Sequence, residues 1–149
     1  MKINKIAFAA LLALSLTPGY SQKTEVSMQD ILIRADTFVN MIEMDYEQEI
    51  VRMEFDILRD SKETFRYLTD DYEYGIFAFG DFRIKDVDIS VYVYDGTGWV
   101  LEAKDEEENE FALLSISPEK TQKYKIEVKA YSFAEGYDVG HYGLIIFHE

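Results

Sequence analysis

The 149-residue chain alternates apolar and polar side chains from about position 48 onward, and this two-residue period constrains its fold more than any other feature. The clearest runs lie at 51–57, 86–94 and 124–130. Successive side chains of a β-strand point to opposite faces, so this period indicates strands with one face in a core and the other in water.

The alternating segments are short and are separated by turn residues, with no helical pattern between them. One turn, Asp95-Gly96-Thr97-Gly98, has the composition of a hairpin. Strands recurring about every 8–15 residues are typical of sandwiches and jelly rolls. We therefore predict a mainly β domain over residues 47–149, an antiparallel, jelly-roll-like β-sandwich of about eight strands. The expected strands are 51–57, 65–68, 72–79, 86–94, 99–103, 111–116, 124–130 and 142–147, with a turn at 60–63 between the first two.

A helix is expected before the strands, within a leader and helix segment at 22–46. Its apolar residues have helical spacing, and Ser27 and Asp30 form a capping-box pattern at its start. The predicted helix spans 28–45. The residues of its apolar stripe are Ile31, Leu32, Ala35, Phe38, Val39 and Ile42.

The segment 86–94 raises a question about the outer surface of its sheet. If its Val and Ile residues point inward, Tyr92 and Tyr94 point outward, where large apolar surface needs a cover or a purpose. The simplest solution is that the N-terminal helix packs over part of an outer sheet face. An aromatic ligand platform and scattered surface tyrosines are the alternatives.

The N-terminus has the form of a signal peptide over residues 1–21. Lys2 and Lys5 precede an apolar run at 6–16, and small residues precede a cleavage site before Gln22. We therefore expect a secreted or periplasmic bacterial protein. No second run of about 18 apolar residues follows, so no membrane insertion is expected after cleavage.

Charge and residue usage exclude several classes of function. Lys and Arg number 15 against 29 Asp and Glu, a net charge of −14, which disfavours nucleic acid as a partner. The chain has no Cys, hence no disulfide and no thiol nucleophile. It has two histidines, His141 and His148, and no G-x-S-x-G motif. We expect no enzymatic activity, and a hydrolase using a carboxylate pair is the least favoured alternative.

Four motifs in order resemble the bacterial pre-peptidase C-terminal domain class, which includes the collagen-binding modules of collagenases. They are the strand at 72–76, the Asp-Val-Asp-Ile strand at 86–93, a Ser-Pro turn before 124–128, and a Gly-Tyr…Tyr-Gly-Leu-Ile-Ile close at 136–146. The resemblance implies a β-sandwich accessory module without catalysis. Such modules are often attached to secreted hydrolases and sometimes bind calcium.

Carboxylates around the 86–94 strand are candidate metal ligands. Asp86 and Asp88 share one strand face, and they could converge with Asp95 and with Asp105 of the acidic run 105–110. Ca²⁺ takes six to eight oxygen ligands, so calcium is the candidate cofactor. The alternative is that these carboxylates accept loop amides. The acidic run itself is either a solvated loop that protects a sheet edge or a surface for cations or basic partners.

Tyr92, Tyr94 and Trp99 are the candidate ligand-binding residues, because aromatic faces suit stacking on sugars. Packing at the sandwich edge is the alternative role of Trp99, the only Trp. The sequence therefore predicts a secreted, non-catalytic binding or accessory module for a protein or carbohydrate at the cell envelope. A small periplasmic inhibitor or accessory subunit of an envelope enzyme is the alternative.

Overall fold

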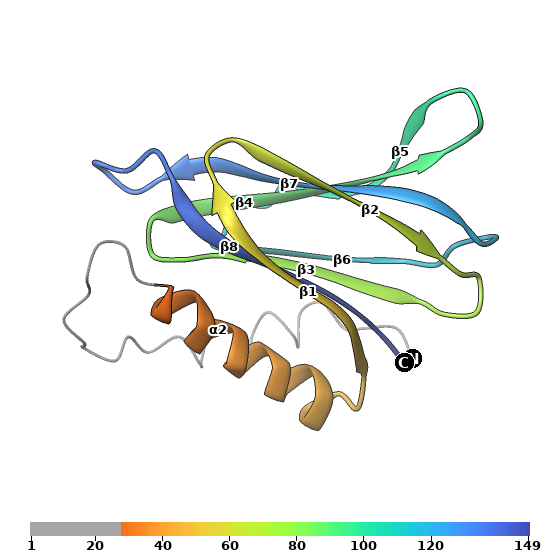
Figure 1. Ribbon diagram of the computed structural model, residues 1–149, viewed down its shortest axis with the longest axis horizontal. Coiled ribbons are helices and arrows are strands. Elements are labelled where there is room, and N and C mark those ends of the chain that lie inside the picture. The colour runs from red at the N-terminus through yellow and green to blue at the C-terminus, as the bar shows by residue number, and fades with distance from the viewer. Residues whose placement is uncertain (1–27) are drawn as a thin grey trace.

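The computed structural model describes residues 28–149, which form an α-helix, one turn of π-helix and eight strands (Figure 1). The predicted signal peptide at 1–21 lies outside these residues. The helical segment consists of α2 (Gln29–Asn40) and η1 (Met41–Asp45). The strands are β1 (Glu49–Leu58), β2 (Ser61–Leu68), β3 (Tyr74–Gly80), β4 (Ile84–Tyr94), β5 (Trp99–Asp105), β6 (Phe111–Ile116), β7 (Gln122–Phe133) and β8 (Gly140–His148).

The strands form two four-stranded antiparallel sheets that pack face to face. Their orders are β1-β8-β3-β6 and β2-β7-β4-β5, so consecutive strands change sheet everywhere except at the β4–β5 hairpin, as in a jelly roll. The predicted antiparallel β-sandwich with one N-terminal helix is confirmed.

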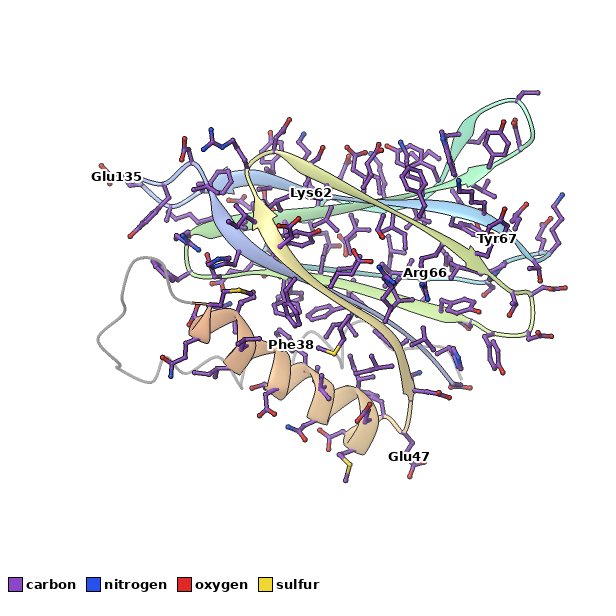
Figure 2. The ribbon with its side chains drawn as sticks, in the orientation of Figure 1. Phe38, Glu47, Lys62, Arg66, Tyr67 and Glu135 are labelled. Carbon is purple, nitrogen blue, oxygen red and sulfur yellow. The ribbon has the colours of Figure 1, made fainter. Side chains whose placement is uncertain are left out.

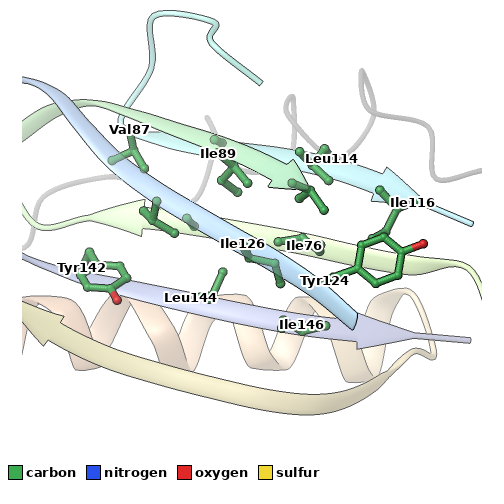
Figure 3. Packing of buried hydrophobic residues seen from close by; sticks show 14 of the residues in the cluster. Ile76, Val87, Ile89, Leu114, Ile116, Tyr124, Ile126, Tyr142, Leu144 and Ile146 are labelled. Atoms are coloured by element: carbon green, nitrogen blue, oxygen red, sulfur yellow. The ribbon is translucent and has the colours of Figure 1, made fainter. Parts of the chain in front are cut away.

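The inward-facing residues of both sheets make one continuous core (Figure 3). In β7 the core residues are Tyr124, Ile126, Val128 and Ala130, and in β4 they include Val87, Ile89 and Val91. These are the apolar members of the alternating runs. The sequence period therefore corresponds directly to the side of each strand that is removed from water.

The turn expected at 60–63 was wrong. Lys62 already pairs with Val128 in the β2–β7 ladder, and the chain turns instead at Arg59 and Asp60, between β1 and β2. The inward-facing side chains in the first part of β2 are polar. One of them, Thr64, donates a hydrogen bond to the Glu54 carboxylate at 2.8 Å. Without apolar residues at alternate positions, this part of the strand could not be recognised from its pattern.

Helix α2 and η1 cover the outer face of the β1-β8-β3-β6 sheet (Figure 1). Phe38, which Figure 2 shows between the helix and the sheet, places its ring 4.7 Å from the rings of both Phe77 and Phe79. Gly75 and Gly143 make room for this layer, since a Cβ at either position would collide with the ring of Phe147 or Phe79, respectively. The layer also includes Ile31, Ala35, Met41, Ile42, Leu113 and Ile145.

The expected capping box cannot be placed in the described residues, but other contacts attach the start of the helix to the sandwich. Its N-cap residue is Met28, whose side chain makes no capping hydrogen bond, and Ser27 lies outside the described residues. The Asp30 carboxylate accepts a hydrogen bond from the amide of Phe82 at 3.3 Å, and Arg34 donates to the Glu110 carboxylate at 2.7 Å. These two side-chain contacts attach the first turns of the helix to the sandwich.

The helix covers an outer sheet face, as predicted, but not the face that carries Tyr92 and Tyr94. Those tyrosines lie on β4, in the β2-β7-β4-β5 sheet, and the helix packs on the other sheet. Within residues 28–149, no helix is long and apolar enough to cross a membrane.

Candidate functional site

The outer face of the β2-β7-β4-β5 sheet carries a cluster of four aromatic rings and two lysines, which we call the aromatic–lysine patch. Its residues are Phe65, Tyr92, Tyr94, Trp99, Lys123 and Lys125. The strand register brings them together, because Tyr94 lies opposite Trp99, and Lys125 lies between Phe65 and Tyr92.

Rings from both edge strands meet across the two central strands. Phe65 comes from β2 and Trp99 from β5, yet their ring centroids are 5.5 Å apart. Tyr94 is 5.3 Å from Trp99 on its other side. Tilted ring pairs at this separation are favourable aromatic contacts. The patch is therefore one connected cluster rather than a set of isolated surface rings.

The lysine ammonium groups lie over these rings. The Nζ of Lys123 is 5.1 Å from the centroid of Phe65, and the Nζ of Lys125 is 4.3 Å from that of Tyr92, both within cation–π range. Lys125 also donates to the Glu63 carboxylate at 2.9 Å, and this hydrogen bond raises the pKa of Lys125. The ammonium group of Lys125 is thus charged at neutral pH, and the ammonium groups of both lysines lie among the rings.

Much of this apolar surface remains in contact with water. Phe65 is 46% exposed and Tyr94 43%, while Tyr92 and Trp99 are half-buried. The three aromatic residues proposed from the sequence therefore lie together on one open face. Sequence reasoning missed Phe65. Its alternation with the inward-facing Arg66 and Leu68 could have placed it on the outer side of β2.

Two of the predicted metal ligands, Asp86 and Asp88, lie at the other end of the same sheet face. They line an open cavity of about 530 Å³ together with Glu106 and Glu108. Asp86 accepts a hydrogen bond from the amide of Asn109 at 3.1 Å. Its carboxylate thus helps to hold the acidic loop, the structural role considered as the alternative.

The remaining two predicted ligands lie elsewhere. Asp105, at the end of β5, accepts hydrogen bonds from the amides of Leu113 at 3.0 Å and Glu107 at 3.2 Å. Asp95 lies in the β4–β5 turn, where hydrogen bonds from Thr97 and Gly98 lower the pKa of its carboxyl group.

The four carboxylates do not gather at one point. Asp95 lies nine positions beyond Asp86 along an extended chain, about 30 Å at the usual rise per residue. Among residues 28–149, no group of three or more histidine, aspartate or glutamate side chains could hold a metal ion. Calcium binding stays a prediction.

A buried ionic cluster at the β3–β4 turn has no counterpart in the sequence analysis. The Asp81 carboxylate accepts hydrogen bonds from the Arg83 guanidinium at 2.5 Å and from the His141 amide at 2.9 Å. Burial acts to raise the pKa of Asp81, but these hydrogen bonds and the Arg83 charge outweigh it, so the pKa is lowered. The cluster ties the turn to β8 and is fully internal.

Comparison with known proteins finds structures of similar fold but no matching family model and no matching curated protein. The pre-peptidase C-terminal domain of collagenase from Bacillus anthracis is similar at 13% identity, covering 64% of this chain and 87% of that chain, with a TM-score of 0.49. The resemblance drawn from the sequence is thus also present among solved structures.

Two other similar structures are more distant in TM-score. A periplasmic inhibitor of g-type lysozyme from Aeromonas hydrophila is 9% identical, covering 68% of this chain and 86% of that chain, with a TM-score of 0.46. A family 32 carbohydrate-binding module from C. perfringens, in complex with galactose, is 12% identical, covering 63% and 75%, with a TM-score of 0.35. At these identities the likeness concerns the fold alone.

Proposed function

We propose that this protein is a secreted, non-catalytic β-sandwich binding module whose aromatic–lysine patch binds a carbohydrate. The observation that supports the proposal is the gathering of rings from β2, β4 and β5 on a face that the helix leaves open. In an antiparallel sandwich, a solvated sheet face normally carries polar residues. Contiguous exposed rings on such a face are typical of an interaction surface.

A carbohydrate suits the chemistry of this patch. Sugar rings present apolar C–H faces that stack on aromatic side chains, and their hydroxyl groups accept hydrogen bonds from ammonium donors. The patch offers both kinds of group within one cluster, since the Nζ of Lys123 lies 5.1 Å from the Phe65 ring and 5.9 Å from the Trp99 ring. A sugar could therefore contact a ring face and a charged donor at the same time.

The placement of the two histidines supports a role without catalysis. The Nδ1 of His141 lies 2.8 Å from the buried Arg83 guanidinium, and His148 stacks on Tyr72 with ring centroids 3.9 Å apart. Both belong to β8, in the opposite sheet. Neither ring is thus available to act as a base at the aromatic–lysine patch.

The proposal is tested by titrating the protein with a panel of oligosaccharides while recording the fluorescence of Trp99, the only Trp. We expect a saturable change with at least one sugar. Tyr94→Ala should weaken that sugar about tenfold, equivalent to about 1.4 kcal/mol. Tyr72→Ala is the matched control, because Tyr72 is 44% exposed, close to the 43% of Tyr94, and packs against β8 instead. An equal loss in both variants, or no saturable change with any sugar, would overturn the proposal.

Secretion is tested separately. N-terminal sequencing of the protein recovered from the periplasm or medium of an expressing bacterium should find a chain that begins at Gln22. Recovery of only the uncleaved chain in the cytoplasm would contradict the proposed export.

A further inference from the structure

A second feature of the open face is an acidic pocket at the end of β4 that lies away from the β4–β5 turn. Its cavity of about 530 Å³ is within the size range of small-molecule sites. The lining includes four carboxylates, Asp86, Asp88, Glu106 and Glu108, and one ammonium group, that of Lys129. The ring of Tyr131, which is largely exposed, completes one wall.

Asp88 distinguishes this pocket from an ordinary solvated acidic loop. Its residue is only 8% exposed, yet within residues 28–149 its carboxylate makes no hydrogen bond and no ion pair. Other buried carboxylates of the chain are satisfied: Asp81 has Arg83, and Asp86 has the Asn109 amide. Ionising a carboxyl group in a site that excludes most water is costly. No side-chain oxygen of the described residues is both fully buried and unpaired, so the Asp88 carboxylate opens into the pocket, where a compensating cation could reach it.

The neighbouring charges increase this cost. Burial raises the pKa of Asp88, and the negative charges of Asp86 and Glu106 raise it further, whereas Lys129 opposes them only partly. Lys129 lies opposite Asp88 in the ladder, but its Nζ lies 5.4 Å from the centroid of the Tyr131 ring. The Lys129 ammonium, the one cationic group among the lining residues, thus lies over the Tyr131 ring and does not neutralise Asp88.

We propose that the acidic pocket binds a small organic cation, a primary amine or a guanidinium, through the carboxylate of Asp88 and the ring face of Tyr131. Four carboxylates against one ammonium group leave the lining with an excess of negative charge, which outweighs the repulsion from Lys129, and the largely exposed Tyr131 ring offers a face for a cation. An organic cation also fits better than a bare metal ion. Ca²⁺ needs six to eight converging oxygens, and in the described part of the chain no such group of side chains comes together.

The experiment titrates the whole protein with each of three probes and records amide NMR spectra at every step. The salt concentration is about 150 mM, which screens weak surface attraction. The probes are cadaverine as a free diamine, acetyl-arginine amide as a peptide-borne guanidinium, and CaCl₂. We expect saturable shifts at Asp88, Lys129 and Ser132 with one or both organic cations. Which of the two binds more tightly tells whether a free amine or a peptide side chain is the better ligand.

Two variants decide whether the binding belongs to this pocket. Asp88→Asn should weaken the organic cation about tenfold or more. It should still fold, because it removes a repelled charge. Glu119→Gln, an exposed acid in the turn between β6 and β7, should leave the affinity unchanged. The proposal is overturned by shifts that grow linearly without saturation, by equal losses in both variants, or by saturable binding of Ca²⁺ alone.

Discussion

The two outer faces of the sandwich differ although both sheets share one core. Beneath α2, every residue of β3 and β8 is buried, because one set of side chains faces the core and the other faces the helix. On the opposite side, β7 alternates between buried and accessible positions, and its outward lysines meet water. The comparison shows that aromatic residues on an outer sheet face have two different roles here. Those under the helix stabilise the fold, and those without a cover stay in contact with water, at the face where we propose that a ligand binds.

Charged groups show the same contrast. Asp81, at the end of the covered sheet, is 1% exposed and is compensated by the Arg83 guanidinium. Asp88, on the open face, is almost as buried but is surrounded mainly by like charges. Burial opposes ionisation of both carboxyl groups, but only Asp81 has hydrogen bonds and a counter-charge that outweigh it, so the pKa of Asp81 is lowered and that of Asp88 is raised.

The largest difference between the faces should appear on removing one aromatic ring from each. Phe38→Ala should destabilise the protein by about 3–5 kcal/mol, because it empties a ring site between the helix and β3. Phe65→Ala, on the open face, should cost about 1 kcal/mol or less, since its ring is already 46% exposed. Urea unfolding of both variants measures the two costs. Equal costs would show that the helix-covered layer contributes no more stability than the open patch.

Breaking the compensated charge should come next. Asp81→Asn should cost about 3 kcal/mol at neutral pH, because it leaves the buried Arg83 guanidinium without its counter-charge. The pKa of Asp81 is lowered in the folded state, so its contribution is present above the usual value of 3.8 and is lost as the pH falls through the folded pKa. Unfolding curves measured from neutral to acidic pH should therefore show the gap between the parent protein and the variant closing in acid. A constant gap would contradict the proposed ionic origin.

The smallest effect should have the opposite sign. The pKa of Asp88 is raised in the folded state, so its ionised form opposes folding at neutral pH, and stability is gained as the pH falls through that pKa. Asp88→Asn should consequently raise the melting temperature at pH 7, and the gain should shrink in acid. Thermal unfolding at both pH values measures it. A lower melting temperature for the variant at pH 7 would show that Asp88 is compensated after all.

The sequence does indicate which sheet face the helix covers, but through a different pattern from the one on which the prediction relied. Residues 76–79 and 144–147 are continuously apolar, a pattern expected of strands buried on both faces. The prediction instead relied on Tyr92 and Tyr94 and so directed the helix to the wrong sheet. The apolar stripe of a helix indicates that it covers a sheet face. Only the continuous apolar runs in the strands indicate which sheet that is.

The site was predictable only where neighbouring strands form a hairpin. The turn at Asp95 to Gly98 places Tyr94 opposite Trp99, so these two residues could be paired from the sequence. Phe65 enters the same patch through the long-range pairing of β2 with β7, which no local pattern encodes. Alternation likewise puts Asp86 and Asp95 near one strand, but it carries no information about how far apart their side chains lie.

The position of β8 between β1 and β3 bears on how the molecule is made. Glu49 pairs with His148, so the first strand of the sandwich finds its partner about a hundred residues further along the chain. Pairings so distant in sequence close slowly, and until β8 joins the sheet the layer beneath the helix lacks Ile145 and Phe147. Under the export proposed above, this delay would keep the chain unfolded for longer, the form in which it could be translocated.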